Sequence, residues 1–231
     1  MRLKVASYNI HKAVGTDRRR DPDRILTVLH EIDADIVALQ EVDRRFGSRE
    51  TVLPRQAVEE HGWRVANLRT MPASMGWHGN AILVRRAVSI TDCNPIKLPR
   101  LEPRGAVRAS LSVDGLPLTV VGTHLDLSGL RRRHQVAAIA DHLHGSDHPA
   151  LIMGDCNEWT PGSGMLRPFA DDWQLLDPGR SFPSRAPVAK LDRIVASPHW
   201  RVIECGVHHS ALAARASDHL PVHATLELLK N

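Results

Sequence analysis

Two stretches of the chain repeat one pattern, in which an apolar strand, a helix and a second apolar strand follow one another. Predicted strands ending at Asn9 and Glu41 flank the first helix, and strands ending at His124 and Asp155 flank the second at nearly the same spacing. The expected ranges are Lys4–Asn9, Asp21–Ile32 and Asp35–Glu41, then Leu116–His124, Ser128–His144 and Ala150–Gly154. Functional groups collect at the carboxyl ends of strands in α/β sheets. Two such units packed face to face would therefore direct four polar strand ends into one cleft.

The rest of the sequence adds strands and a short helix, and no linker or low-complexity tract divides it. We expect a helix at Leu53–His61 and strands at Trp63–Ala66, Gly79–Arg85, Val88–Leu98, Gly105–Val113, Leu191–Ala196, Val202–Val207 and His219–Leu228. Asp21 before Pro22 predicts the start of the first long helix, and Ser128 predicts a cap for the second. A chain of 231 residues can bury one large core, so we expect a single α/β domain over residues 1–231.

Composition excludes several classes of protein. The longest apolar runs fall short of the roughly 18–20 residues of a membrane helix, and the N-terminus lacks the apolar segment of a secretory signal. Three scattered cysteines exclude a disulfide framework, so we expect a cytoplasmic protein. A net charge of +4 is modest for a protein that coats nucleic acid. The arginine runs at 18–20 and 131–133 are interpreted either as solvated surface or as the rim of an active face.

Six short segments place polar residues immediately beside apolar strands. They contain Asn9 with His11, Gln40 with Glu41, His124 with Asp126, Asp155 with Asn157, Asp192, and Asp218 with His219. A carboxylate drawn toward a core is costly unless it is paired or binds a metal, and capping alone does not explain six such segments. The oxygen donors favour a hard cation such as Mg²⁺, and the histidines suit proton transfer or phosphate binding. This set of groups fits phosphoester hydrolysis.

These ordered segments, from Ala6-Ser7-Tyr8-Asn9 to Ser217-Asp218-His219-Leu220-Pro221, resemble those of the endonuclease/exonuclease/phosphatase superfamily. The resemblance implies a four-layer α/β/β/α sandwich, in which two packed mixed β-sheets are flanked by helices. It also implies hydrolysis of phosphoester bonds by in-line attack of water on phosphorus, with Mg²⁺ or Mn²⁺ as the cofactor.

The resemblance also assigns roles to individual residues. Asn9, Glu41 and Asp218 resemble metal ligands, and the catalytic set is His124, Asp155, Asn157, Asp192 and His219. Asp192 resembles the acid that orients His219, which is either the general base or an imidazolium that clamps the transition state. Asn80 and Arg104 are weaker candidates for contact with the substrate phosphate, and His78 for support of His124.

The sequence leaves the substrate open. We interpret the chain as a phosphodiesterase whose substrate is nucleic acid, a phospholipid head group or a small phosphodiester. We infer no obligate protein partner. His11 stands where abasic-site endonucleases carry an acidic residue, and 231 residues leave little room for loops that grip duplex DNA. The alternative is a catalytically silent module of the same fold that recognises phosphate.

Overall fold

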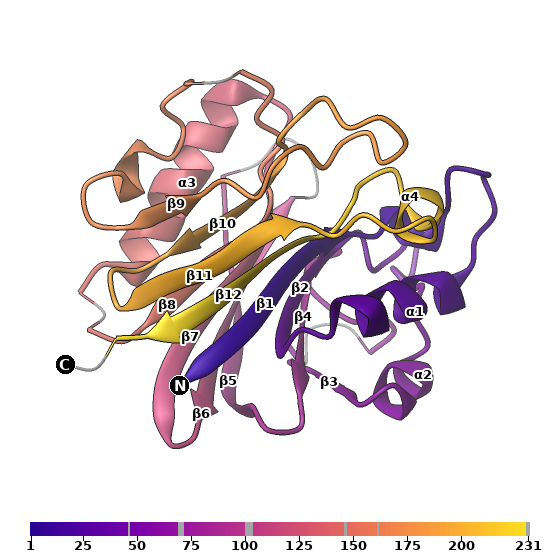
Figure 1. The fold of residues 1–231 in the computed structure, drawn as a ribbon, viewed down its shortest axis with the longest axis horizontal. Coiled ribbons are helices and arrows are strands. Elements are labelled where there is room, and N and C mark those ends of the chain that lie inside the picture. The colour runs from indigo at the N-terminus through magenta and orange to yellow at the C-terminus, as the bar shows by residue number, and fades with distance from the viewer. Residues whose placement is uncertain (46, 69–71, 100–103, 146, 161, 230–231) are drawn as a thin grey trace.

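The computed structural model describes residues 1–231 apart from 46, 69–71, 100–103, 146, 161 and 230–231. Its strands form two six-stranded mixed sheets (Figure 1). In spatial order the first sheet contains β11 (Trp200–Val207), β12 (Val222–Leu228), β1 (Arg2–Asn9), β2 (Ile36–Gln40), β4 (Ala81–Arg85) and β3 (Trp63–Val65). The second contains β5 (Ser89–Ile96), β6 (Gly105–Val113), β7 (Leu116–His124), β8 (Ala150–Asp155), β10 (Asp192–Ala196) and β9 (Gln174–Leu176).

The two repeated units of the sequence supply one parallel strand pair to each sheet. β1 pairs with β2 across α1 (Pro22–Ile32), and β7 pairs with β8 across α3 (Gly129–Leu143). A helix is the usual crossover between parallel neighbours, because the second strand must begin at the same edge as the first. In register, Asn9 lies beside Gln40 and His124 lies beside Asp155. The polar ends of each pair therefore lie at one edge of its sheet.

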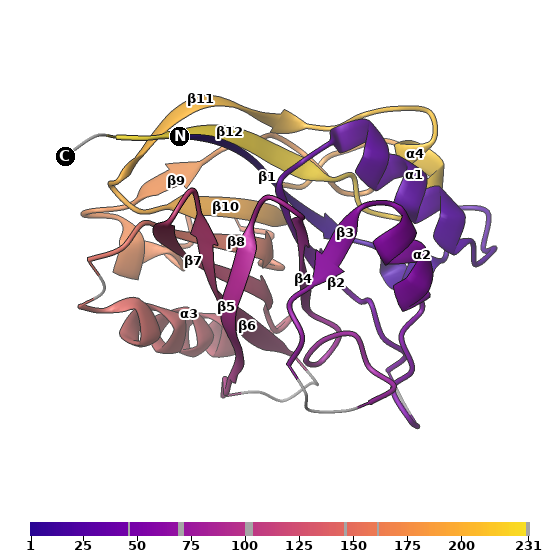
Figure 2. The ribbon, with the colours of Figure 1, turned by 90° about the horizontal axis from the view of Figure 1, so that it is seen from below.

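Three apolar cores separate four layers, as expected. The inner faces of the two sheets form the central core, which includes Val5, Ile36, Val107, Val120 and Met153. α1 and α2 (Arg55–Glu60) pack on the outer face of the first sheet, and α3 packs on the outer face of the second (Figure 2). The α/β/β/α sandwich is thus confirmed, and the sheets lie close enough for residues at their ends to meet.

The helix starts agree only partly with the predictions. Asp21 caps α1, because its carboxylate accepts a hydrogen bond from the Arg24 backbone N–H. Ser128 occupies the cap position of α3, as predicted, but its side chain makes no capping bond. Asp126 accepts from the Ser128 N–H instead, and Arg132 donates to the Leu127 carbonyl at 2.6 Å.

Several elements differ from the sequence predictions. β12 begins at Val222 rather than at His219, because Pro221 has no N–H to donate and the Leu220 N–H donates to Ser181 of a neighbouring loop. The three-residue strand β9 and the four-residue helix α4 (Ala213–Ala216) were not predicted, since such short elements carry little periodicity. The 3-10 helices η1 (His11–Ala13) and η2 (Arg167–Phe169) are also additions.

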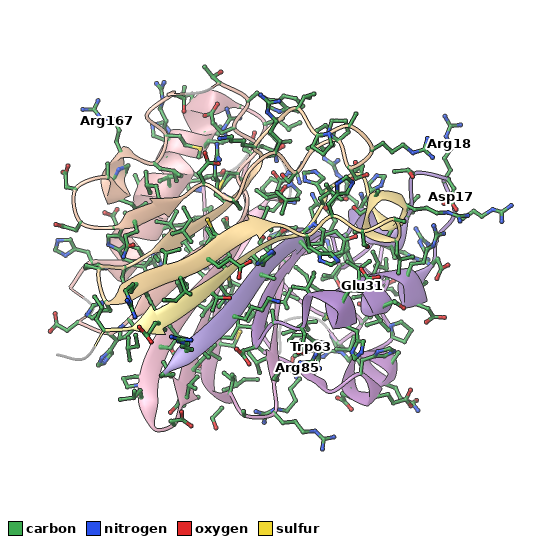
Figure 3. The ribbon with its side chains drawn as sticks, in the orientation of Figure 1. Asp17, Arg18, Glu31, Trp63, Arg85 and Arg167 are labelled. Carbon is green, nitrogen blue, oxygen red and sulfur yellow. The ribbon has the colours of Figure 1, made fainter. Side chains whose placement is uncertain are left out.

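The two arginine runs have different environments. Arg18 is exposed and points away from the body of the protein (Figure 3). Arg132 is buried and forms an ion pair with Glu158 at 3.3 Å. Arg132 is therefore neither part of a solvated surface nor part of the rim of an active face, because its guanidinium pairs with a carboxylate inside the protein.

Candidate active site

A hydrogen bond between Asn9 and Asp155 joins the two sheets at the centre of the site. The Asn9 amide at the end of β1 donates to Oδ2 of Asp155 at the end of β8, at 2.9 Å, and both side chains are buried. The Asn9 side-chain oxygen Oδ1 accepts from the His11 backbone N–H. This bond connects residues 146 positions apart, and it shows that the two repeated units face each other as predicted.

Asp155 is the residue on which the other predicted catalytic groups converge. Its Oδ2 lies 3.3 Å from Nε2 of His124 and 3.7 Å from Nε2 of His219, while its Oδ1 accepts from the Asn157 N–H. Burial alone would raise the pKa of Asp155, but the two imidazoles and the Asn9 amide outweigh it and hold this pKa well below its usual range. Asp155 is therefore an ionised acceptor that faces two histidines.

Asp192 orients His219 from the adjacent strand. β10 places Asp192 directly opposite Asp155, and Asp192 Oδ2 lies 2.9 Å from Nδ1 of His219. Ser181 donates to the same oxygen, and the Phe182 ring packs against the His219 ring with centroids 4.8 Å apart. Burial would lower the pKa of His219, but Asp192 and Asp155 raise it to about 10. The His219 ring is therefore positively charged, and its Nε2–H faces Asp155.

Glu41 leaves the end of β2 in the left-handed region, at φ 58°. Gly79 makes room for this turn, since a Cβ there would lie 3.3 Å from the Glu41 Cα. Left-handed backbone is uncommon outside glycine and tends to occur at functional sites. Burial opposes ionisation of Glu41, but His124, Lys12 and Arg104 lower its pKa below the ordinary value. The Glu41 carboxylate is therefore charged and surrounded by positive groups.

Lys12 is a site residue that the sequence reasoning missed. Its Nζ forms an ion pair with Glu41, and it belongs to three consecutive left-handed residues, from His11 to Ala13. Such a run of strained backbone is not visible in the sequence. The one signal was that Lys12 is among only five lysines of an arginine-rich chain and lies three positions after Asn9.

The remaining predicted site residues differ in their positions. Nη1 of Arg104 lies 2.7 Å from Nδ1 of His124 and 3.8 Å from Glu41, so Arg104 is part of the site. Asp218 is partly exposed and lies 3.8 Å from the His11 ring. Asn80 is fully buried, and its amide donates to the backbone carbonyls of Trp77 and Gly105. Contact of Asn80 with a substrate phosphate therefore stays a prediction.

A strongly cationic pocket opens beside Glu41 and His124. Its lining residues are Lys12, Glu41, Asp43, Arg44, Arg45, Arg49, His78, Gly79, Arg104 and His124. His78, predicted to support His124, contacts Arg49 at 2.9 Å and packs edge-on against Trp77. Arg44 is paired with Glu50. The excess of basic over acidic groups makes this pocket suited to a phosphate.

The donor groups of the site fit a divalent cation. Asp155, Asp192 and His219 form a buried group, with ligand atoms within 4.8 Å of one another, that could hold a metal, and this group differs from the ligand set predicted from the sequence. The three metal ligands predicted from the sequence all contact η1: Asn9 through the His11 N–H, Asp218 through the His11 ring, and Glu41 through Lys12. Carboxylate and amide oxygens are the donors that Mg²⁺ prefers.

The chain belongs to the Endonuclease/Exonuclease/phosphatase family, whose model matches residues 6–219. Members of this family are hydrolases of phosphoester bonds and are generally dependent on divalent metals. A curated relative, the uncharacterized protein YbhP of Escherichia coli strain K12, is 26% identical over 250 residues, which cover 97% of this chain and 94% of YbhP.

Solved structures confirm the fold. An endonuclease/exonuclease/phosphatase of Bacteroides vulgatus superposes with a TM-score of 0.78 at 18% identity, covering 99% of this chain and 100% of that one. D. rerio TDP2 complexed with a single-strand DNA product gives 0.75 at 16% identity, covering 98% and 99%. The human Nocturnin catalytic domain with a bound sulfate gives 0.75 at 18% identity, covering 99% and 95%. Within the described residues, no helix is long and apolar enough to cross a membrane.

Proposed function

We propose that this protein is a phosphodiesterase that depends on Mg²⁺, with Mn²⁺ as a substitute, and that it hydrolyses its substrate by in-line attack of water on phosphorus. The observation that carries the proposal is the convergence of Asn9, His124 and His219 on the ionised Asp155, from both sheets. A buried carboxylate between two imidazoles is suited to the handling of a water proton next to a phosphate.

The metal ligands in this proposal are Asn9, Glu41 and Asp218. When bound, the ion supplies positive charge that neutralises the phosphate and the developing leaving group. The contacts of all three residues with η1 support this assignment, as does the pairing of Glu41 with the Lys12 ammonium, which shows that this carboxylate accepts a positive partner.

The protein groups around Asp155 supply the rest of the chemistry. His124 and His219 both present Nε2 toward Asp155, so both can donate to phosphate oxygens at the same point. Asp155 then orients the attacking water and accepts its proton, while Asn157, fixed by its bond to the Leu125 carbonyl, holds the phosphate. Asp192 is the positioning residue for His219, which acts as the imidazolium clamp because two carboxylates flank it.

Turnover of bis-p-nitrophenyl phosphate across a Mg²⁺ and Mn²⁺ titration tests the proposal. We expect hydrolysis of this diester faster than of p-nitrophenyl phosphate, and its loss in EDTA. Asp155→Asn should lower kcat by about 10²–10⁴-fold. Asp141→Asn, at an exposed position of α3, is the matched control and should retain activity. Phosphate binding without turnover would instead identify a silent recognition module, and activity that survives EDTA would refute metal dependence.

The location proposed for this activity is the cytoplasm. Cys93, Cys156 and Cys205 are free thiols in the structure, which supports a reducing compartment. We propose that residues 1–231 act as a single domain and as a monomer.

A further inference from the structure

Four large apolar side chains are exposed on segments that follow β7 and β8 or precede β10. They are Leu127 (56% exposed), Leu130 (64%), Trp159 (55%) and Val188 (65%), here called the apolar rim. Single exposed apolar residues are ordinary, but a group of them beside a functional site marks an interaction surface.

A chain of contacts places the apolar rim beside the active site. Arg132 donates to the Leu127 carbonyl and pairs with Glu158, so the start of α3 adjoins the segment that carries Trp159. The Trp159 ring meets the Phe182 ring edge-on, with centroids 5.6 Å apart. The Phe182 ring in turn packs against His219.

Val188 joins the same group through the backbone, because its N–H donates to the Phe182 carbonyl at 2.8 Å. Trp159 and Val188 also line a groove of about 730 Å³. Met165, Leu166, Leu175 and Leu176 continue its apolar lining, and Arg167, Arg180 and Arg193 add positive charge. Its two acids, Glu158 and Asp177, are paired with Arg132 and Lys190. The rim therefore leads from the catalytic histidine into an apolar groove with basic walls.

Arginines accompany the rim on the same segments. Arg131 and Arg133 flank Arg132 at the start of α3, while Arg180 and Arg185 lie on the loop that carries Phe182 and Val188. Within the described ranges of the chain, none of these four has a carboxylate partner. Glu158, the acid next to Trp159, is already neutralised by Arg132. The surface is thus both apolar and positively charged.

We propose that the apolar rim and its arginines dock the protein on an anionic lipid surface, so that the phosphodiester hydrolysed at the site is a lipid head group. This inference rests on the proposed function. Apolar side chains that insert below the head groups, with arginines at the level of anionic phosphates, are the chemistry of interfacial binding.

The composition of the rim favours lipid over a nucleic acid strand. Single-stranded nucleic acid binds to rows of aromatic platforms, whereas three of the four rim residues are aliphatic. Exposed leucine and valine gain nothing from contact with phosphates or sugars, but they are stabilised when acyl chains cover them. The groove beside the rim is also apolar, so it suits the apolar part of a lipid.

Flotation with vesicles tests the proposal independently of catalysis. We would measure binding in EDTA to vesicles of phosphatidylcholine alone and of phosphatidylcholine with phosphatidylglycerol, with the full chain. We expect binding to the anionic vesicles, weaker binding to the neutral ones, and an affinity at least about tenfold lower for the Leu127→Ser/Leu130→Ser variant.

The matched control is Leu116→Ser/Ile203→Ser, which removes two comparably exposed apolar side chains elsewhere and should bind like the wild type. Turnover of bis-p-nitrophenyl phosphate should be unchanged in both variants, which also shows that they fold. Equal loss of vesicle binding in both, or no binding to anionic vesicles by the wild type, would overturn the docking proposal even if hydrolysis is intact. Preferential binding of a single-stranded oligonucleotide that depends on Leu127 and Leu130 would overturn it in favour of nucleic acid.

Discussion

Replacement of Asp192 by asparagine removes the charge that orients His219 while keeping nearly the same shape. Asp192 is fully buried and accepts from both Ser181 and His219. Removal of one partner of a buried ion pair costs about 3–5 kcal/mol of stability. Because the His219 ring still faces Asp155 at 3.7 Å, we expect the lower end of this range, about 3 kcal/mol. For a chain of this length that corresponds to a decrease in Tm of roughly 6–12 °C.

The same substitution should impair catalysis more than stability alone explains. The asparagine no longer supplies the negative charge that raises the pKa of His219, so the ring loses its positive charge more readily and clamps the phosphate less strongly. We expect kcat for bis-p-nitrophenyl phosphate to fall by about 10²–10⁴-fold at a temperature where the variant is folded. Asp141→Asn serves again as the control. A variant with activity within about threefold of wild type and an unchanged Tm would refute the positioning role of Asp192.

Three further predictions follow from the charged groups of the site. In metal-free protein, His219 should stay protonated through pH 8, because its pKa is raised from 6.5 to about 10. The ¹⁵N chemical shifts of its imidazole measure this protonation, and titration near pH 6.5 would contradict the prediction. The stability that this raised pKa contributes is fully present below about pH 6.5 and is lost as the pH rises through about 10. The free energies of unfolding of wild type and Asp192→Asn, measured in urea, should therefore converge at high pH. Lys12→Met should bind Mg²⁺ about tenfold more tightly in calorimetry, because the ammonium no longer competes for Glu41; weaker binding would show that Lys12 supports the ion instead.

The sequence predicted the fold well where hydrophobic periodicity was strong. The strands ending at Asn9, His124 and Asp155 are recovered with their helical crossovers, because each carries a long apolar run. The predictions failed at short or irregular elements. Ser128 makes no side-chain capping bond, and its own N–H donates to Asp126 instead. The segment from His219 to Pro221 lies in a loop, where the Leu220 N–H donates to the Ser181 carbonyl.

The sequence indicated which residues the structure brings together at the candidate site, but not their contacts. Strand-end acids and histidines identified Asp155, Asp192 and His219, because polar groups next to buried strands need partners. The position of Lys12 depends on left-handed backbone, which local propensity disfavours and only the surrounding structure can impose. The burial of Asn80 against the Gly105 carbonyl was equally invisible, since a strand-end amide can turn inward or outward.

Location of Mn²⁺ by anomalous diffraction from crystals of this protein is the most direct test of whether remote segments meet around one ion. We expect an anomalous peak within coordination distance of a Glu41 carboxylate oxygen and beside Asn9, at the edge where the two sheets join. A peak bound away from Glu41, or clear hydrolysis by protein from which the metal has been removed, would contradict this assignment.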